Sequence, residues 1–148
     1  MKCLKLWFSS REFGRILSGT DDITDDALRN IKTKSGLNIT REDIQRFPVF
    51  LKSFKPYSGI IYRGVSKQDK IYLQVLSGTE VVTKRYYSCS HKKIFAEMFS
   101  SQDNILLVIS TKRTFDVSVH SREYEVILDK NITLKVIKHE ENVVYLSD

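Results

Sequence analysis

Residues 123–129, Glu-Tyr-Glu-Val-Ile-Leu-Asp, combine two glutamates with an apolar run that predicts a β-strand. On a strand, residues two positions apart point to the same face, so Glu123 and Glu125 are expected side by side. Two carboxylates this close repel each other unless a cation or a chemical role offsets the repulsion. A pair of glutamates on a strand also fits an ordinary solvated face, and both interpretations stay open at this point.

Further strands are predicted on either side of this segment, throughout the chain after Pro56. Their sequences are apolar or alternating, and they are bounded by turn residues such as Lys130-Asn131. The predicted strands cover residues 59–65, 71–76, 80–88, 105–110, 132–138 and 142–147. One helix interrupts them at residues 92–99, with Phe95, Met98 and Phe99 expected on one face.

The part of the chain before Pro56 has a helical pattern instead. Residues 21–34 carry apolar side chains at helical spacing, with acidic residues early and lysines late, and Ser35-Gly36 is expected to end this helix. Thr40, followed three positions later by an acidic residue, predicts the N-cap of the next helix. Pro48 must kink or shorten that helix unless it lies in the first turn. The fold class is therefore α+β.

The composition is typical of one globular domain. The 148 residues are 41% hydrophobic and 28% charged, which excludes a disordered chain, and no apolar run is long enough to span a membrane. Two cysteines and three histidines lack the spacing of a disulfide framework or a metal site, so no metal is expected. The first residues lack a signal-peptide core, which favours the cytoplasm. The net charge of +6 indicates an anionic ligand or partner, although charge alone equally fits a generic basic domain.

Two more features place polar side chains near predicted strand ends. Arg63 ends an apolar strand, where a charge must be paired or line a cleft. Ser88-Cys89-Ser90 ends another strand and leads into a helix. Singly, the arginine fits a structural ion pair and the serines fit a helix N-cap. Their order along the chain, followed by Glu123 and Glu125, is far more specific than any one of them.

This order resembles the R-S-E pattern of mono-ADP-ribosyltransferases, a family with cholera-toxin-like, ecto-enzyme and phage branches. The resemblance runs from Gly59 to Asn131, about half of the chain. Three finer details are similar: Tyr62-Arg63-Gly64-Val65 to Y-R-G-V, Phe95-Ala96-Glu97-Met98-Phe99 to an A-E-x-F helix, and Asp116-Val117-Ser118 with Ser121 to D-I-S…S. The sequence departs from the pattern at Cys89, where the family has threonine, and its loop before Glu123 is short.

The resemblance implies a fold and an organisation of the chain. It implies a single ADP-ribosyltransferase-like domain over residues 1–148, with a helical N-terminal part at 1–55 and a β-rich NAD-binding core at 56–148. The core is expected to be a split, mainly antiparallel β-sandwich with the N-terminal helices packed on it.

The resemblance also implies roles for the residues that carry it. Glu125 would stabilise the oxocarbenium-like cation formed as NAD+ loses nicotinamide, and Glu123 would take a proton from an arginine acceptor. Arg63 would bind the NAD+ phosphates, and Gly64 would let the backbone approach the nicotinamide amide. Ser88 would orient Glu125 by hydrogen bonding. The other cofactor-binding residues would be Ser90 and Phe95, whose ring would stack on nicotinamide.

The implied activity is transfer of ADP-ribose from NAD+ to arginine side chains of a target protein, with release of nicotinamide. Glutamate at position 123 favours arginine, because in the family glutamine there goes with other acceptors. The alternatives are an NAD+ glycohydrolase, transfer to a non-arginine or nucleic-acid acceptor, and a basic module that only binds. The small size and missing export signal favour a monomeric phage or bacterial effector in the cytoplasm, with nucleic-acid machinery among its candidate targets and no membrane partner.

Overall fold

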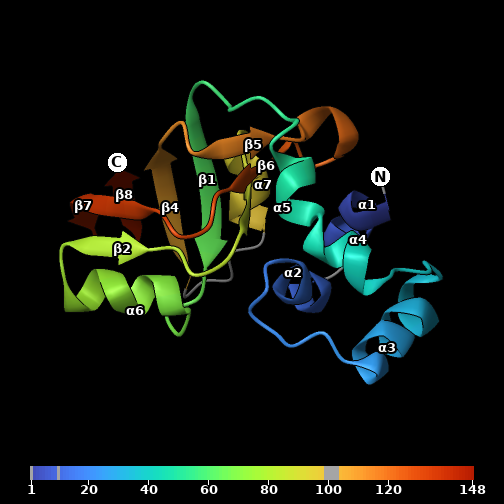
Figure 1. Cartoon of the computed structure of the whole chain (residues 1–148). Coiled ribbons are helices and arrows are strands. Elements are labelled where there is room, and N and C mark those ends of the chain that lie inside the picture. The colour runs from blue at the N-terminus through green and yellow to red at the C-terminus, as the bar shows by residue number, and fades with distance from the viewer. Residues whose placement is uncertain (1, 10, 99–103) are drawn as a thin grey trace. The chain divides into compact units, whose positions relative to one another are not determined.

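The computed structural model describes residues 2–9, 11–98 and 104–148 (Figure 1). Backbone contacts divide the chain into two compact units, Met1–Phe54 and Lys55–Asp148. The first unit is helical, and the second holds every strand of the described residues.

The N-terminal unit is built from short helices around an apolar centre. They are α1 (Lys2–Ser9), α2 (Arg11–Leu17), α3 (Asp25–Ser35), α4 (Arg41–Gln45) and α5 (Phe47–Leu51). The fully buried side chains include Leu6 and Phe47, and the Trp7 ring stacks on the Phe47 ring with centroids 5.9 Å apart. Burial of these large side chains is the main stabilising contribution in a unit of this kind.

Local capping explains where these helices begin and end. Thr24 caps α3, because its hydroxyl accepts a hydrogen bond from the Ala27 N–H, and Gly36 ends the helix in the left-handed conformation, φ 72°. Thr40 begins α4 with a reciprocal capping box. Pro48 lies in the first turn of α5, where its missing N–H removes no helical hydrogen bond. The end of α3 at Gly36, the cap at Thr40 and the place of Pro48 agree with the sequence predictions, whereas α3 begins at Asp25 and not at the predicted residue 21.

The C-terminal unit is organised by one eight-stranded sheet. Its strands are β1 (Ile60–Val65), β2 (Glu80–Val82), β3 (Tyr87–Ser90), β4 (Ile105–Ser110), β5 (Thr114–Asp116), β6 (Glu125–Leu128), β7 (Thr133–Glu140) and β8 (Val143–Ser147). Their order is β2-β7-β8-β4-β1-β3-β6-β5. Among the strands of the described residues, only β4 and β8 pair in parallel, so the expectation of a mainly antiparallel sheet is confirmed.

The pairing between β1 and β3 is much shorter than the pairing between β1 and β4. β1 pairs with β4 along its whole length, from Ile60 to Val65, but it pairs with β3 only at Tyr62 and Ser90. The strands β3, β6 and β5 on one side of this junction are therefore linked weakly to the five strands on the other. This agrees with the predicted split core. Over most of their facing edges, the backbone groups of β3 and β1 are not joined by strand hydrogen bonds, so those of β3 need other partners.

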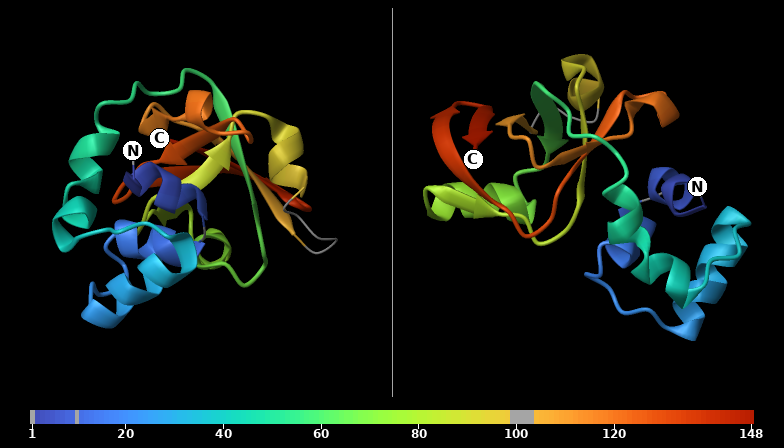
Figure 2. Two further views of the ribbon diagram at one scale, coloured as in Figure 1. Left: turned by 90° about the vertical axis from the view of Figure 1, so that its right-hand side faces the viewer. Right: turned by 45° about the horizontal axis from the view of Figure 1, so that its top comes forward.

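One predicted strand is a helix, so that prediction was wrong. Residues 71–76 belong to α6 (Lys70–Ser77), which lies beside β2 (Figures 1 and 2). Asp69 caps this helix through a 3.0 Å hydrogen bond from the Ile71 N–H to its carboxylate. Ile71, Tyr72 and Val75 are buried, and this spacing is that of a helix face, which outweighs the strand propensity of these residue types.

The predicted strand at residues 80–88 is interrupted. A bend at Lys84-Arg85 separates β2 from β3, and the fully buried Thr83 anchors the break. Its hydroxyl donates to the Asp129 carbonyl at 2.9 Å and accepts from the Ile132 N–H at 3.1 Å. The strand β5 was not predicted.

The predicted helix at residues 92–99 is α7 (Lys93–Met98), which lies beside β1 and β3. Its buried residue is Ala96, whereas Met98 is 72% exposed, so the predicted face was wrong at Met98. Phe99 lies outside the residues that the structure describes.

The core of the C-terminal unit is apolar and packs against one face of the sheet. It combines side chains of α6 with those of seven strands, β1 to β4 and β6 to β8. Within the described residues, no helix has the length and apolar character needed to cross a bilayer.

Candidate functional site

Adjacent strands carry the two serines and Glu125 to one face of the sheet. In the β3–β6 ladder, Ser90 lies directly opposite Glu125, and Ser88 lies opposite Ile127. Directly opposed residues of antiparallel strands point to the same face, as do residues two apart on one strand. Ser90 and Glu125 are each 6% exposed, and Ser88 is half-buried. The register therefore groups a carboxylate with two hydroxyls in a mostly buried environment.

Arg63 lies on β1, the neighbouring strand. Because Tyr62 is the residue opposite Ser90, Arg63 starts from the other face of the sheet and meets the backbone of β3. Its Nη1 donates a 2.6 Å hydrogen bond to the Ser88 carbonyl, and its guanidinium carbon lies 5.0 Å from the centroid of the Tyr87 ring. The residue is 8% exposed, yet its buried Nε has no hydrogen-bond partner in the described structure. A buried donor without a partner is costly, so this guanidinium is suited to receive an anionic ligand. Arg85 also lies over Tyr87, at 5.2 Å.

Cys89 is buried in the core of the C-terminal unit. Burial raises the pKa of its thiol to about 12, and the Glu125 carboxylate contributes to the rise while the Arg63 guanidinium opposes it. The thiol itself stays protonated and unreactive at neutral pH.

Glu123 does not lie on the strand that carries Glu125. β6 begins at Glu125, and the preceding residue, Tyr124, has a left-handed backbone with φ 53°. Strand alternation does not pass through such a residue, so the expectation that both glutamates share a strand face was wrong. Glu125 is buried, whereas Glu123 is exposed in a turn.

The Ser90 hydroxyl holds this turn in place through hydrogen bonds. The oxygen lies 2.7 Å from the Glu123 carbonyl and 3.3 Å from the Tyr124 carbonyl, and it accepts a hydrogen bond from the Lys92 N–H at 3.1 Å. A buried hydroxyl that donates to these carbonyls fixes the backbone on which both glutamates stand. Its observed contacts are those of a positioning residue.

The loop before Glu123 is held by its own side chains. The Asp116 carboxylate accepts from both the N–H and the hydroxyl of Ser118, at 3.0 and 2.6 Å, at the start of the short 3-10 turn η1 (Ser118–His120). The Ser121 hydroxyl accepts from the Glu123 N–H at 3.1 Å. The polar residues that resemble the family's D-I-S…S stretch thus fix the approach to the turn.

The other two predicted cofactor-binding residues are Gly64 and Phe95. Gly64 is buried in β1, opposite Leu106 of β4. Phe95 is half-buried on α7, and its ring centroid is 5.6 Å from that of Tyr124.

Sequence reasoning singled out Phe95 but missed the aromatic cluster that Phe95 forms with Tyr57, His91 and Tyr124 beside the glutamates. The Tyr57 and His91 rings stack with centroids 4.8 Å apart and planes 7° apart, and His91 meets Tyr124 edge-on at 5.3 Å. No local signal pointed to this cluster, because its members come from distant parts of the chain and Tyr124 looked like an ordinary strand residue. The sequence shows only that aromatic residues are common in this chain, 11% of the total.

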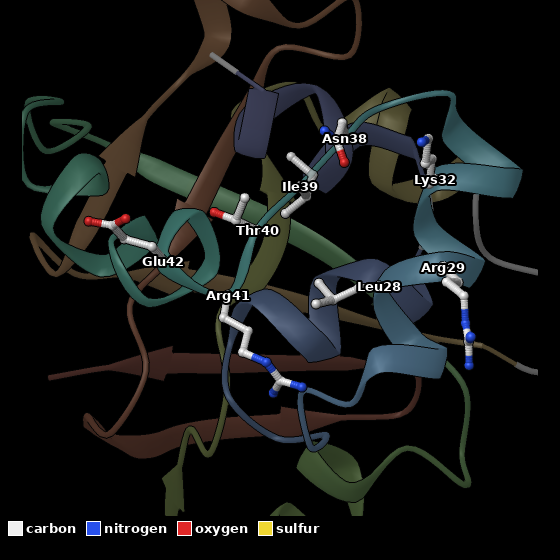
Figure 3. Close-up of a pocket in the computed structure, with 8 residues that line it drawn as sticks. All are labelled: Leu28, Arg29, Lys32, Asn38, Ile39, Thr40, Arg41 and Glu42. Carbon is white, nitrogen blue, oxygen red and sulfur yellow. The ribbon is translucent and has the colours of Figure 1, made fainter.

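The N-terminal unit has a surface hollow of its own, with a volume of about 470 Å3 (Figure 3). It is lined by Leu28, Arg29, Lys32, Asn38, Ile39, Thr40, Arg41 and Glu42. Two of its cations already pair with carboxylates, Arg41 with Asp25 at 2.7 Å and Arg29 with Asp26. The charged side chains of both ion pairs are exposed, and exposed ion pairs contribute little to the free energy of folding.

Among the described residues, no three histidine, cysteine or acidic side chains gather to hold a metal ion.

The fold is that of mono-ADP-ribosyltransferases over nearly the whole chain. The Vis toxin, an ADP-ribosyltransferase from Vibrio splendidus, is 16% identical with a TM-score of 0.59, and the match covers 99% of this chain and 70% of that one. HopU1 of Pseudomonas syringae pv. tomato DC3000 is 17% identical with a TM-score of 0.60, over 99% and 75%. Exoenzyme S of Pseudomonas aeruginosa is 15% identical with a TM-score of 0.61, over 98% and 70%.

Two of these relatives have been solved with ligands. A crystal structure of Vis contains agmatine, and the Exoenzyme S structure is bound to carba-NAD. The sequence itself matches no protein-family model and no curated protein. At such low identity the likeness establishes the fold, and the predicted fold class is confirmed.

Proposed function

We propose that this chain is a mono-ADP-ribosyltransferase that transfers ADP-ribose from NAD+ to the guanidinium group of arginine side chains on a target protein. The observation that carries the proposal is that three neighbouring strands of the sheet hold the residues of the recognised pattern. Arg63, Ser88 and Glu125 come from the adjacent strands β1, β3 and β6, although they lie far apart in the sequence. The fold supports it, since relatives with this fold bind agmatine and carba-NAD.

The binding of NAD+ fits the polar groups at this site. The substrate carries two phosphates, and a guanidinium offers a planar set of donors that matches phosphate oxygens. Arg63 is mostly buried, one of its nitrogens is fixed by the Ser88 carbonyl, and its Nε lacks a partner. A phosphate oxygen would supply that partner. The Ser88 carbonyl holds Arg63, while the Ser88 side chain lies on the same face as Glu125, where a ribose hydroxyl would meet both.

Glu125 supplies the electrostatic part of the chemistry. The bond between the ribose C1′ and the nicotinamide nitrogen breaks, its electron pair leaves with neutral nicotinamide, and the ribose becomes an oxocarbenium-like cation. A carboxylate held in a buried position stabilises that cation, because screening by water is weak there. Glu125, at 6% exposure and fixed in β6, meets this requirement.

Glu123 would act as the general base for the acceptor, the arginine side chain of the target protein. A guanidinium is protonated at neutral pH and is a poor nucleophile until it loses a proton. As its nitrogen forms the new bond to C1′, that proton passes to the Glu123 carboxylate. Glu123 is exposed in the turn, so a side chain on the surface of a large target can reach it. The net charge of +6 would favour targets with acidic surfaces, including nucleic-acid machinery.

The proposal is tested with NAD+ labelled on its adenylate side, incubated with the protein and agmatine. We expect a labelled agmatine adduct and one nicotinamide released per adduct. The variant Glu125→Gln keeps the shape of the side chain without its charge, and it is expected to lower the rate about 100-fold or more.

Three outcomes would contradict this assignment. Labelled ADP-ribose alone would indicate that water is the acceptor, as in an NAD+ glycohydrolase. In a treated lysate, mass spectrometry that finds ADP-ribose only on other residues or on nucleic acid would overturn the arginine acceptor. Release of nicotinamide by Glu125→Gln at the original rate would remove the catalytic role of this carboxylate.

A further inference from the structure

Tyr124, between the two glutamates, has an unusual backbone conformation. Its φ of 53° lies in the left-handed region, which bulky side chains rarely adopt. A glycine or asparagine would occupy the position with less strain. Such strain persists only where the surroundings enforce it, and it tends to occur where a side chain is presented for a purpose.

The neighbouring corner between β3 and α7 enforces this conformation. The His91 N–H donates a 3.2 Å hydrogen bond to the Tyr124 carbonyl, and the Ser90 hydroxyl lies 3.3 Å from the same oxygen. With its carbonyl held from two sides, Tyr124 cannot relax into the strand conformation that would return its side chain to the pattern of β6.

The ring of Tyr124 is fixed by other rings but is not covered by them. His91 meets it edge-on at 5.3 Å, and Phe95 lies tilted against it at 5.6 Å. Tyr57 stacks on the His91 ring and steadies it. The residue nevertheless stays 44% exposed. The cluster therefore presents a rigid aromatic surface next to Glu123.

A cation already lies over this surface. The Lys92 ammonium is 5.7 Å from the centroid of the Tyr124 ring, within the range of a cation–π interaction. The ring thus attracts positive charge in the protein as it stands. A guanidinium is planar and less strongly hydrated than an ammonium, so it stacks on such a ring more favourably.

We infer that the Tyr124 ring is the surface on which the acceptor guanidinium stacks, and that Lys92 competes with the acceptor for it. The inference rests on the proposed function and adds the residue that orients the acceptor. Nicotinamide is also a planar cation in NAD+, but its ribose must lie at the buried Glu125. Tyr124 is exposed and adjoins the exposed Glu123, which is the side from which a large target arrives.

The test measures steady-state transfer to agmatine in Tyr124→Leu and Tyr124→Phe. Loss of the ring in Tyr124→Leu is expected to raise the KM for agmatine about tenfold, while the KM for NAD+ changes less than twofold. Tyr124→Phe keeps the ring face and should stay within about twofold of the original KM for agmatine. Tyr145→Leu is the matched control, because Tyr145 on β8 is 36% exposed and lies outside the cluster.

Lys92 provides a change of opposite sign. Lys92→Met keeps a long apolar side chain but removes the competing charge, so the KM for agmatine should fall about threefold. If the competition takes place on the ring, this gain disappears in the double variant Lys92→Met/Tyr124→Leu. A gain that persists in the double variant would show a general effect of charge and would overturn the competition on the ring.

The inference and the proposed function fail in different ways. If the original protein cleaves NAD+ but never modifies agmatine, the arginine acceptor is wrong and the role of Tyr124 fails with it. If agmatine is modified and Tyr124→Leu leaves its KM unchanged, the inference alone is wrong. If Tyr124→Leu raises the KM for NAD+ as much as that for agmatine, the ring belongs to the donor site, which also overturns it. The retained KM for NAD+ serves as the control for folding.

Discussion

Glu125 and Glu123 are two residues apart in the sequence, but their surroundings are opposite. Glu125 is 6% exposed, begins β6 and faces Ser90 across the ladder, whereas Glu123 is exposed in a turn. The left-handed backbone of Tyr124 separates the two environments. The difference suggests how one short segment serves two substrates: a buried carboxylate can stabilise a cation strongly, and an exposed one can meet a macromolecule.

Glu123→Gln should separate the roles of the two carboxylates most strongly. The amide cannot take the proton of the guanidinium, so transfer to agmatine should fall about 100-fold. Cleavage of NAD+ with water as the acceptor should fall less than about tenfold, because Glu125 remains in place. Parallel assays of the adduct and of free ADP-ribose check both rates.

An equal fall of both rates in Glu123→Gln would contradict separate roles for the two glutamates. The exposed carboxylate would then act in bond cleavage as well, and the division between a donor side and an acceptor side would be wrong. The matched variant Glu97→Gln changes an exposed glutamate of α7 and should leave both rates within about twofold.

A smaller effect is expected on the buried side, from Arg63→Lys. Lysine keeps the charge but has a single nitrogen, so it cannot both donate to the Ser88 carbonyl and offer a planar pair of donors to phosphate. The KM for NAD+ should rise about 30-fold, and the KM for agmatine should change little. Equal rises in both constants would place Arg63 outside the donor side. Circular dichroism shows whether the variant is folded.

Much of the fold could be predicted because its signals are local. The αL cap at Gly36, the capping box at Thr40 and the apolar strand of residues 105–110 follow from neighbouring residues alone. The helix α6 was missed because its β-branched and aromatic residues favour a strand, while the deciding feature was the cap at Asp69. There the helical spacing of the buried residues carried more information than their propensities.

The candidate site was only partly predictable, because it depends on contacts between distant residues. The order of Arg63, Ser88 and Glu125 could be recognised, but which residue lies opposite Glu125 is a matter of register, and the structure gives Ser90. The conformation of Tyr124 depends on hydrogen bonds from a different strand end. No property of the segment itself indicates a left-handed tyrosine.

The smallest effect is expected from Cys89, which is buried in the core. Burial raises the pKa of its thiol to about 12, above the ordinary value of 9.0, so the folded protein keeps a proton that the unfolded chain releases. The free energy of unfolding is therefore unaffected well below pH 9. It falls as pH rises towards 12, by about 1 kcal/mol between pH 9 and 10 from this group.

Cys89→Ala should lower the free energy of unfolding by the same amount at every pH well below 9 and make its fall at alkaline pH shallower. Urea titrations of both proteins at pH 7, 9 and 10 would show this. The tyrosines Tyr86 and Tyr87, whose pKa values are also raised by burial, should leave a residual fall at higher pH in both proteins. Equal slopes in the two proteins would mean that the Cys89 thiol is not held in an apolar environment, and the buried character of the donor side would lose that support.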